Sequence, residues 1–355
     1  MNIARIAAVL VTVVCLAACG SGTTSQVAPH KKIAFLAPDA APRFESQDRP
    51  LFQAKLQSVC ADCELLYRNA GGDPVTQSQQ AQAVLTAGAN VIVLDPVDPN
   101  GASAIVAAAA KRHVPVIAYD RLVLNASGVA YYVGFDNAAV GVLQAGALLR
   151  AMKASGLPSV VMMHGDPANP DAAVLKKAVH TTLDGKVTVA KEYDTPSASA
   201  DNAALEMTQA LAAVQNKVDG VYAANDDVAA GAVAAMKTAG LKDLPPVTGG
   251  DAELPAVQRI IAGEQYMTIY RPVKMEVDAA AVIAYDLAFG VAVPVAMTAG
   301  ATVNNTARDV PAALIEPMAV TRRELVSTVV ADGFWTRTQI CTAEFTKACR
   351  AAGLS

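Results

Sequence analysis

The chain has 355 residues, of which 53% are hydrophobic and 17% are charged. This composition is too apolar for a disordered protein, and the length is sufficient for two compact domains. The formal net charge of −4 excludes the strongly basic surface that nucleic-acid-binding proteins need, so we expect no nucleic-acid partner.

The N-terminal segment predicts export and lipid attachment. Arg5 precedes an apolar run that is too short to span a membrane comfortably. The run leads into Leu-Ala-Ala-Cys-Gly, which resembles a bacterial lipoprotein signal in which Cys19 becomes the lipidated N-terminus. A plain secretory signal with an incidental cysteine is the alternative. We therefore expect a signal peptide at residues 1–18, a flexible tether at 19–30, and a lipid anchor at the extracytoplasmic face of the cell envelope.

Four cysteines remain beyond the predicted signal and lipidation site, namely Cys60, Cys63, Cys341 and Cys349. An even number in an exported chain favours disulfides, and the short spacings favour Cys60–Cys63 and Cys341–Cys349 over the two other connectivities. A redox pair or half of a zinc site at Cys60 and Cys63 is the alternative. The second pair lacks the close spacing of a metal knuckle, and no active-site helix pattern frames the first. We therefore predict structural bridges and no metal site.

From Lys31 the chain alternates short β-rich runs with helical segments, which predicts parallel sheets covered by helices on both faces. The first set has predicted strands at 33–37, 65–67, 91–94 and 114–119 and predicted helices at 51–59, 77–87 and 102–111. Each strand–helix–strand connection is expected to be right-handed.

The same alternation then restarts. Predicted helices at 138–154, 172–183, 201–214 and 228–238 alternate with predicted strands at 160–163, 187–193, 220–223 and 247–248. Two similar sets in one exported chain predict two lobes of one architecture. No shorter repeat is present, which argues against a solenoid.

The elements that follow are too few for a third domain. A strand at 267–270, an Ala-rich helix at 273–289 and a last helix at 320–330 are predicted there. The late strand and helices fit the two lobes if the chain returns to the first lobe and then crosses to the second lobe again. We therefore expect one lobe from 31–136 plus 271–300 and another from 137–270 plus 301–355, with the crossings forming a hinge.

Polar side chains follow the predicted strands at their carboxyl ends, where open α/β sheets bind ligands. Asp120 and Arg121 follow directly after Tyr119, and an adjacent carboxylate and guanidinium can accept from and donate to hydroxyl groups. A surface ion pair is the alternative. The other strand-end groups are Asp95, Asp136, Asn137, Asn225, Asp226, Asp251 and Arg271. Helix capping is an equal explanation for those that precede helices, which are Asp136, Asn137 and Asp226.

The sequence offers little for catalysis. Of the four histidines, only His164 lies at a predicted strand end, and no serine or cysteine motif accompanies it. There is no Gly-rich phosphate-binding loop. Paired carboxylates suit a glycosidase, but a sugar-binding cleft shows them too. We therefore expect a binding protein without a cofactor rather than an enzyme.

Six motifs in order resemble the D-xylose-binding proteins of ABC importers, which belong to the ribose-type periplasmic binding proteins. They lie at 118–121, 135–137, 224–226, 250–252, 259–263 and 267–272. The likeness extends from about Lys31 to the C-terminal segment, whose two cysteines are similar to those of actinobacterial members. The resemblance implies an α/β fold of periplasmic binding protein type I, in which two Rossmann-like lobes with parallel sheets are joined by a three-crossing hinge. We expect a monomer.

The resemblance also implies a set of sugar-binding residues. These are Arg43, Phe44, Asp120, Arg121, Asn169, Lys176, Asn225, Asp251 and Arg271. Asp120 and Arg121 match a pair that binds sugar hydroxyls, whereas Asn225 and Asp251 match ligands from the second lobe. From the residues alone, Phe44 is the aromatic side chain expected against an apolar face of the ligand, unless it packs under its own loop.

Two departures from the family pattern concern the sugar itself. Ala198 lies near the place of a Trp that usually stacks on the pyranose, and His164 replaces a smaller or amide residue. Losing a stacking face removes on the order of 1 kcal/mol of binding. We therefore expect the solute-binding lipoprotein of an ABC sugar importer, which captures a xylose-like pentose or a related sugar or polyol for its permease subunits. A sugar-sensing receptor subunit and a secreted carbohydrate-active enzyme are the alternatives.

Overall fold

A computed structural model describes residues 30–39, 43–152 and 156–354. The predicted signal peptide, Cys19 and all of the tether except His30 lie outside the described residues. Residues 31–355 form one compact unit. Within the described ranges, no helix has the length and apolar character that a membrane crossing requires.

The first lobe is built on a seven-stranded sheet with the strand order β10-β11-β5-β4-β3-β1-β2. The strands are β1 (Lys32–Ala37), β2 (Glu64–Asn69), β3 (Val91–Leu94), β4 (Val116–Tyr119), β5 (Val129–Phe135), β10 (Thr302–Asn304) and β11 (Asp309–Ile315). All neighbours are parallel except β10, which is antiparallel to β11. Every residue of β3 and β4 is buried, as expected for central parallel strands covered on both faces.

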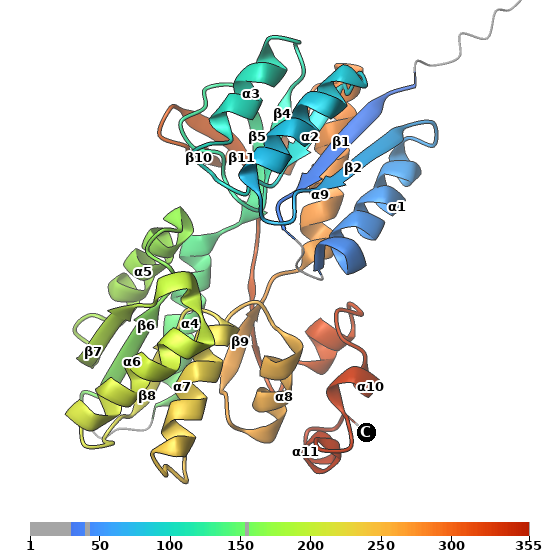
Figure 1. Ribbon diagram of the computed structural model, residues 1–355. Coiled ribbons are helices and arrows are strands. Elements are labelled where there is room, and N and C mark those ends of the chain that lie inside the picture. The colour runs from blue at the N-terminus through green and yellow to red at the C-terminus, as the bar shows by residue number, and fades with distance from the viewer. Residues whose placement is uncertain (1–29, 40–42, 153–155, 355) are drawn as a thin grey trace, which may run out of the picture. The chain divides into compact units, whose positions relative to one another are not determined.

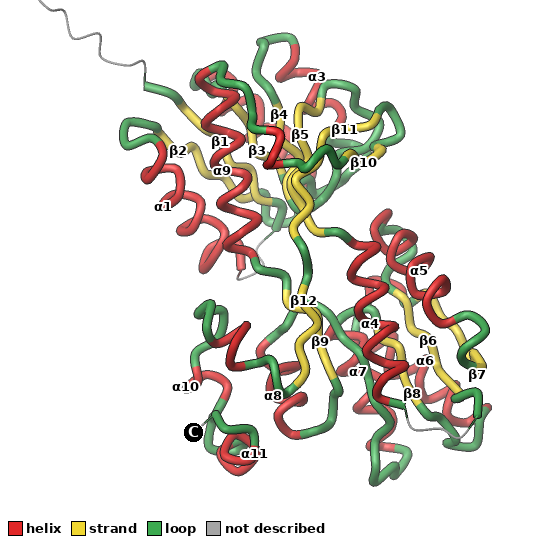
Figure 2. Tube along the Cα trace, turned by 180° about the vertical axis from the view of Figure 1, so that it is seen from behind, coloured by secondary structure: helices red, strands yellow, loops and turns green. Residues whose placement is uncertain are grey.

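Helices cover both faces of this sheet (Figure 1). They are α1 (Arg49–Val59), α2 (Pro74–Thr86), α3 (Ser103–Ala110) and α9 (Val273–Phe289). Figure 2 shows α1 and α9 on one face, where they share an apolar core with β1, β3 and β4. The core on the opposite face includes α2 and α3. Phe35 on β1 contacts the rings of Phe52 and Tyr119, with ring centres 5.0 and 5.2 Å apart.

The second lobe contains a parallel sheet with the order β7-β6-β8. Its elements are β6 (Ser159–His164), β7 (Thr188–Asp194), β8 (Gly220–Ala223), α4 (Asn137–Ala151), α5 (Pro170–Leu183), α6 (Ala200–Ala213) and α7 (Asp226–Thr238). One core joins the sheet to α4 and α5, and another joins it to α6 and α7. Both lobes therefore have the expected layered architecture.

A smaller layer completes the second lobe. Strand β9 (Met267–Tyr270) pairs antiparallel with β12 (Met318–Thr321), as Figure 2 shows. Apolar side chains of α8 (Leu254–Ala262), β9 and β12 pack against the C-terminal segment, which holds the short helices α10 (Arg337–Ile340) and α11 (Thr346–Ala351). The structure contains both predicted disulfides, Cys60–Cys63 and Cys341–Cys349.

The chain crosses between the two lobes at three places (Figure 1). These connections run from β5 to α4, from β9 to α9, and from β11 to β12. Two layered lobes joined by three crossings are the architecture that the resemblance implied.

Several details differ from the prediction. Residues 302–315 were expected in the second lobe, but β11 pairs with β5 and extends the first sheet. The predicted helix at 320–330 is wrong, because residues 318–321 form β12 and a π-helical turn follows at 326–330. Strands β5, β10 and β11 were not predicted, and the predicted strand at 247–248 is only a single bridge between Val247 and Val221. In each case long-range pairing decides, since a strand gains hydrogen bonds only from a partner that lies elsewhere in the sequence.

Candidate functional site

Asp120 lies at the carboxyl end of β4. Its backbone amide donates to the carbonyl of Val133 on β5, and its carbonyl accepts from the Tyr132 hydroxyl, both at 2.9 Å. Asp120 has a φ of 56°, in the left-handed region that residues other than glycine rarely adopt. Such strain persists only where surrounding contacts impose it, and it is frequent at binding sites.

Arg43 joins three carboxylates. Its guanidinium nitrogens lie 3.0 Å from Asp48, 3.3 Å from Asp120 and 3.5 Å from Glu276. The side chains of Asp48 and Glu276 are fully buried, and the Tyr119 hydroxyl also donates to Asp48 at 2.7 Å. One cation therefore connects the segment before α1, the end of β4 and helix α9.

Arg121 interacts with a second pair of acids. One terminal nitrogen lies 3.2 Å from Asp39, and Nε lies 3.8 Å from Asp95. Asp95 is buried, and neither of its carboxylate oxygens has a hydrogen-bond partner within the described residues. Burial, followed by the charge of Asp120, raises the pKa of Asp95, while Arg121 opposes this. Asp120 thus pairs with Arg43, and Arg121 pairs with Asp39 and Asp95. Together these side chains form one charged cluster.

The charge of Asp120 is set by its neighbours. Burial acts to raise the pKa of Asp120, but Arg43, then Arg271 and Arg121, outweigh burial and lower it. Asp120 is therefore ionised at neutral pH and can only accept hydrogen bonds. An ionised acceptor beside guanidinium donors suits a ligand that carries many hydroxyl groups.

Arg271 follows β9 and faces Asp251. Its Nε lies 3.2 Å from Oδ1 of Asp251, yet the geometry is not that of a hydrogen bond, so this buried N–H has no acceptor among the described residues. The guanidinium also lies over the ring of Phe135, 5.4 Å from the ring centre. A buried donor without an acceptor costs about 1–3 kcal/mol. The Nε–H of Arg271 is therefore available to an oxygen atom of a ligand.

A hollow of about 300 Å³ lies beside Arg271 and Asp251. Its polar lining consists of Asn137, Asp166, Asn169, Asp171, Ser197, Asn225, Asp251 and Arg271. Four of the predicted sugar-binding residues are thus brought together here. Burial, then the charge of Asp120, raise the pKa of Asp171, and the guanidinium groups of Arg271 and Arg121 oppose them. The hollow presents amides, carboxylates and a guanidinium at the carboxyl ends of β6, β8 and β9.

Two of the lining amides also cap helices. Asn169 accepts from the backbone amide of Asp171 at 3.0 Å, and Asn225 accepts from that of Val228 at 2.9 Å. Capping occupies the side-chain oxygen of each residue, but the amide nitrogen can still donate. Asn169 and Asn225 can therefore cap their helices and still donate a hydrogen bond to a ligand.

Asp226, next to Asn225, belongs to the core rather than the hollow. It is buried, and it accepts from the Thr268 hydroxyl at 2.9 Å and from Gln265 Nε2 at 2.8 Å. Oδ2, which accepts from Thr268, also accepts from the backbone amide of Glu253 at 3.0 Å. Asp226 therefore ties α7 to β9 and to the start of α8.

Five of the nine predicted sugar-binding residues do not line the hollow. Arg43, Asp120 and Arg121 lie in the charged cluster of the first lobe, and Phe44 and Lys176 lie elsewhere. Phe44 is only 2% exposed, and the guanidinium of Arg43 lies 5.1 Å from its ring centre. Lys176 pairs with Asp194 at 2.8 Å and with Glu192 at 3.0 Å on strand β7. Neither lines the hollow, because burial favours an enclosed position for the apolar ring and opposite charges on the neighbouring strand hold the ammonium group.

The sequence analysis missed three acids of the arginine clusters, namely Asp39, Asp48 and Glu276. Nothing in the local pattern marks Asp39 or Asp48. Glu276 does carry a signal, because it falls three residues after Val273 and four before Ala280, both of which are buried. A carboxylate on the apolar stripe of a helix needs a buried partner.

The raised pKa of Glu253, which lies near Asp251, can be tested through the pH dependence of stability. Burial, then Asp227 and Asp251, raise the pKa of Glu253 to about 7, and Arg259 opposes them. A raised carboxyl pKa contributes stability that is complete below the unfolded-state pKa of about 4.3 and is lost as the pH rises through the folded-state value. We therefore expect Glu253→Gln to be more stable than the unchanged protein at about pH 8, by on the order of 1 kcal/mol after allowance for solvent exposure, and to show no gain near pH 4.

Thermal melting across this pH range measures the effect. The matched control is Glu344→Gln, because Glu344 is exposed, and its melting difference from the unchanged protein should not vary with pH. A Glu253→Gln difference that is equally flat would contradict the electrostatic account.

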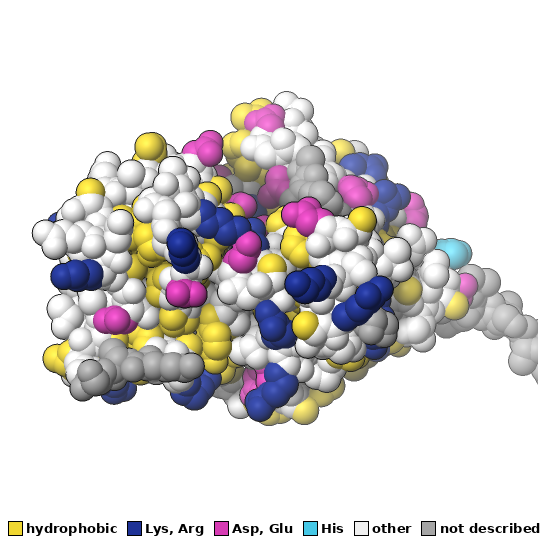
Figure 3. Space-filling view, turned by 90° about the horizontal axis from the view of Figure 1, so that it is seen from below, with side chains coloured by type: hydrophobic (Ala, Val, Ile, Leu, Met, Phe, Trp, Pro, Cys, Tyr) yellow, Lys and Arg dark blue, Asp and Glu magenta, His cyan; other side chains and the backbone are white. Residues whose placement is uncertain are grey.

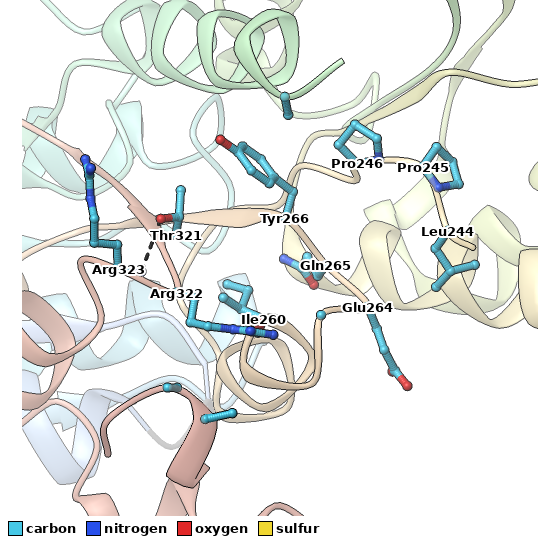
Figure 4. A pocket seen from close by; sticks show the side chains of 14 residues that line it. Leu244, Pro245, Pro246, Ile260, Glu264, Gln265, Tyr266, Thr321, Arg322 and Arg323 are labelled. Atoms are coloured by element: carbon cyan, nitrogen blue, oxygen red, sulfur yellow. Dashed lines mark hydrogen bonds between the residues drawn. The ribbon is translucent and has the colours of Figure 1, made fainter. Parts of the chain in front are cut away.

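A larger hollow of about 760 Å³ lies elsewhere on the second lobe, between the loop at 244–246, helix α8 and residues 321–323 (Figure 4). Figure 3 shows the lower face, where hydrophobic side chains are gathered between separate basic and acidic ones. Arg322 in this hollow already donates to the carbonyls of Ile260 and Ile261, at 3.4 and 2.6 Å. None of the predicted sugar-binding residues line this larger hollow, whereas four of them line the smaller one.

Comparison with known proteins identifies relatives over most of the chain. A family model described as a periplasmic binding protein domain matches residues 33–291. The D-xylose-binding periplasmic protein of Haemophilus influenzae is 36% identical over 299 residues, which cover 83% of this chain and 87% of that protein. The D-xylose-binding periplasmic protein of Escherichia coli is 33% identical over 327 residues, covering 90% and 96%.

Solved structures show the same architecture. A carbohydrate transporter solute-binding protein from Chloroflexus aurantiacus, determined in complex with D-glucose, superposes with a TM-score of 0.74 at 26% identity. The match covers 87% of this chain and 98% of that one.

Proposed function

Because this chain belongs to the periplasmic binding protein family, we propose that it is the solute-binding subunit of an ABC sugar importer. Its ligand is a monosaccharide, either a xylose-like pentose or a related sugar or polyol. The names of the two bacterial relatives support a pentose, and that of the Chloroflexus protein supports a sugar of the same general size.

The observation that carries the proposal is the charged cluster around Asp120. An ionised carboxylate lies within the field of Arg43, Arg121 and Arg271. Sugar hydroxyls can donate to the carboxylate and accept from the guanidinium groups, and hydrogen bonds to charged partners contribute about 1.5–3 kcal/mol each. The amides and acids of the hollow offer further partners from the second lobe.

Ligand capture follows from the three connections between the lobes. A sugar that contacts Asp120 and Arg121 of the first lobe and Asn225 and Asp251 of the second is bound more tightly when the lobes are closed. A ligand shifts an open–closed equilibrium only through such a difference in affinity. The closed form is then the one that ABC permease subunits recognise, and no covalent bond changes.

Ala198 bears on the choice of sugar. It lines the hollow with a φ of 45°, and Ser197 before it has a φ of 56°. A small side chain at this place leaves one face of the ligand without an aromatic ring. A polar pocket without this stacking surface suits polyols as well as pyranoses.

The N-terminal segment supports the remaining parts of the proposal. We propose that residues 1–18 are a signal peptide and that Cys19 carries lipid, so that the monomer stays tethered to the extracytoplasmic face of the membrane. Metabolic labelling with a fatty acid tests this, since Cys19→Ser should abolish the label.

A ligand screen tests the central proposal. Thermal melting with pentoses, hexoses and polyols should identify a sugar or polyol that raises the melting temperature, because a ligand at a hundred times its dissociation constant stabilises by about 2.7 kcal/mol. Titration calorimetry should then give one ligand per chain, and analysis of the ligand afterwards should show it unchanged. No melting shift with any of these compounds contradicts the proposal, and conversion of a glycoside to products indicates an enzyme instead.

A further inference from the structure

Three potential metal ligands converge on one side of the second sheet, outside the hollow described above. They come from three elements, with His164 at the end of β6, His180 on α5 and Glu192 on β7. Nε2 of His164 lies 3.2 Å from Oε1 of Glu192, and Nε2 of His180 lies 3.0 Å from the same oxygen. One ligand atom from each of the three residues lies within 4.8 Å of the others.

The side chain of His164 gives independent evidence that the three residues bind a ligand. It is 1% exposed, and neither of its ring nitrogens has a hydrogen-bond partner within the described part of the chain. A buried polar group without a partner costs about 1–3 kcal/mol. The ring stacks on that of His180, with centres 5.7 Å apart, and a tilted Tyr222 ring lies 5.4 Å away, so the unpartnered Nε2 is enclosed 3.2 Å from Oε1 of Glu192.

His180 has the orientation of a metal ligand. Its Nδ1 lies 3.0 Å from Oδ1 of Asp184, which is within hydrogen-bonding distance. When Nδ1 donates its proton to Asp184, the lone pair of Nε2 points toward Glu192. Metal-binding histidines commonly donate their second ring N–H to a carboxylate in this manner.

We propose that His164, His180 and Glu192 bind one divalent transition-metal ion of the zinc class. Two ligands about 2.1 Å from a tetrahedral zinc ion are separated by about 3.4 Å, which the observed 3.0 and 3.2 Å reach with small side-chain movements. Two imidazoles and one carboxylate suit zinc, copper or nickel, and the open position takes water. The bound ion links α5, β6 and β7.

Lys176 is the competing cation. Its Nζ lies 3.0 Å from the same oxygen of Glu192 and 2.8 Å from Asp194. A metal ion that takes Glu192 leaves Lys176 paired with Asp194, so no charge is stranded. If the ammonium group alone satisfies Glu192, the three residues form only an ion-pair network and no metal binds.

Zinc titration distinguishes these outcomes. The mature chain, prepared without a histidine tag and treated with a chelator, is titrated with Zn²⁺ by calorimetry and by thermal melting. We expect one ion per chain and a higher melting temperature. His180→Ala and Glu192→Gln should each weaken Zn²⁺ binding at least tenfold, since losing even an outer-shell partner costs about 10–100-fold.

His113→Ala is the matched control, because His113 is exposed and lies outside the cluster. It should leave Zn²⁺ binding unchanged. Co²⁺ in place of Zn²⁺ should give the visible absorption of a tetrahedral site, and His180→Ala should remove it. No saturable Zn²⁺ binding, or equal binding by the His180→Ala and His113→Ala proteins, overturns the proposal. Sugar binding is measured separately in each variant, so failure here does not bear on the proposed function.

Discussion

Replacing Asp120 by Asn is expected to lower the affinity for the bound sugar at least tenfold while leaving the fold intact. The ionised carboxylate is the acceptor that Arg43, Arg121 and Arg271 keep charged. Losing a charge-assisted hydrogen bond costs about 1.5–3 kcal/mol, and each 1.4 kcal/mol corresponds to a factor of about ten in the dissociation constant. Titration calorimetry with the sugar that the melting screen identifies measures the effect.

Asparagine is the informative substitution because of the backbone. Asp120 has a φ of 56°, which Asn tolerates much better than Ala does. Asp120→Asn therefore removes the charge without adding strain, whereas Asp120→Ala changes both. Arg121→Ala should also weaken binding at least tenfold, because its partners are then unpaired in a closed site. The control Asp201→Asn, at an exposed position, should bind normally, and unchanged affinity in both Asp120→Asn and Arg121→Ala would refute the site.

Arg43→Met is expected to destabilise the protein by about 3–5 kcal/mol, the usual cost of removing one partner from a buried ion pair. Arg43 is the shared cation of Asp48, Asp120 and Glu276, and the side chains of Asp48 and Glu276 are fully buried. Methionine retains most of the aliphatic volume, so lost packing is a minor part of the effect. Equilibrium unfolding in denaturant measures the difference.

The matched control for this prediction is Arg49→Met. Arg49 pairs with Glu45 at 3.1 Å, but both side chains are about half exposed, at 49% and 48%. An exposed pair of this kind contributes about 0.2–1 kcal/mol. If the two variants lose similar stability, the Arg43 cluster is not the buried network described here.

The sequence by itself determined the architecture and the strand ends. Alternation of short β-rich runs with helical segments predicted two layered lobes, since local hydrophobic periodicity reflects which faces are buried. Asp120 and Arg271 could be placed at a sheet edge because a polar residue directly after a buried strand lies at the carboxyl edge of its sheet. The cysteine spacings were sufficient for both disulfides.

Only the tertiary structure decided which distant residues meet. Glu276 lies 233 positions from Arg43, and no local pattern connects them. Strand β11 joins β5 of the first sheet although it comes after the second lobe in the chain. Lys176 was assigned by resemblance and Phe44 also from its own loop, but charge pairing of Lys176 and burial of Phe44 hold them away from the hollow. These outcomes depend on packing and on Coulomb interactions between elements. The energy of such an interaction depends on the distance in space, and the separation along the chain does not specify that distance.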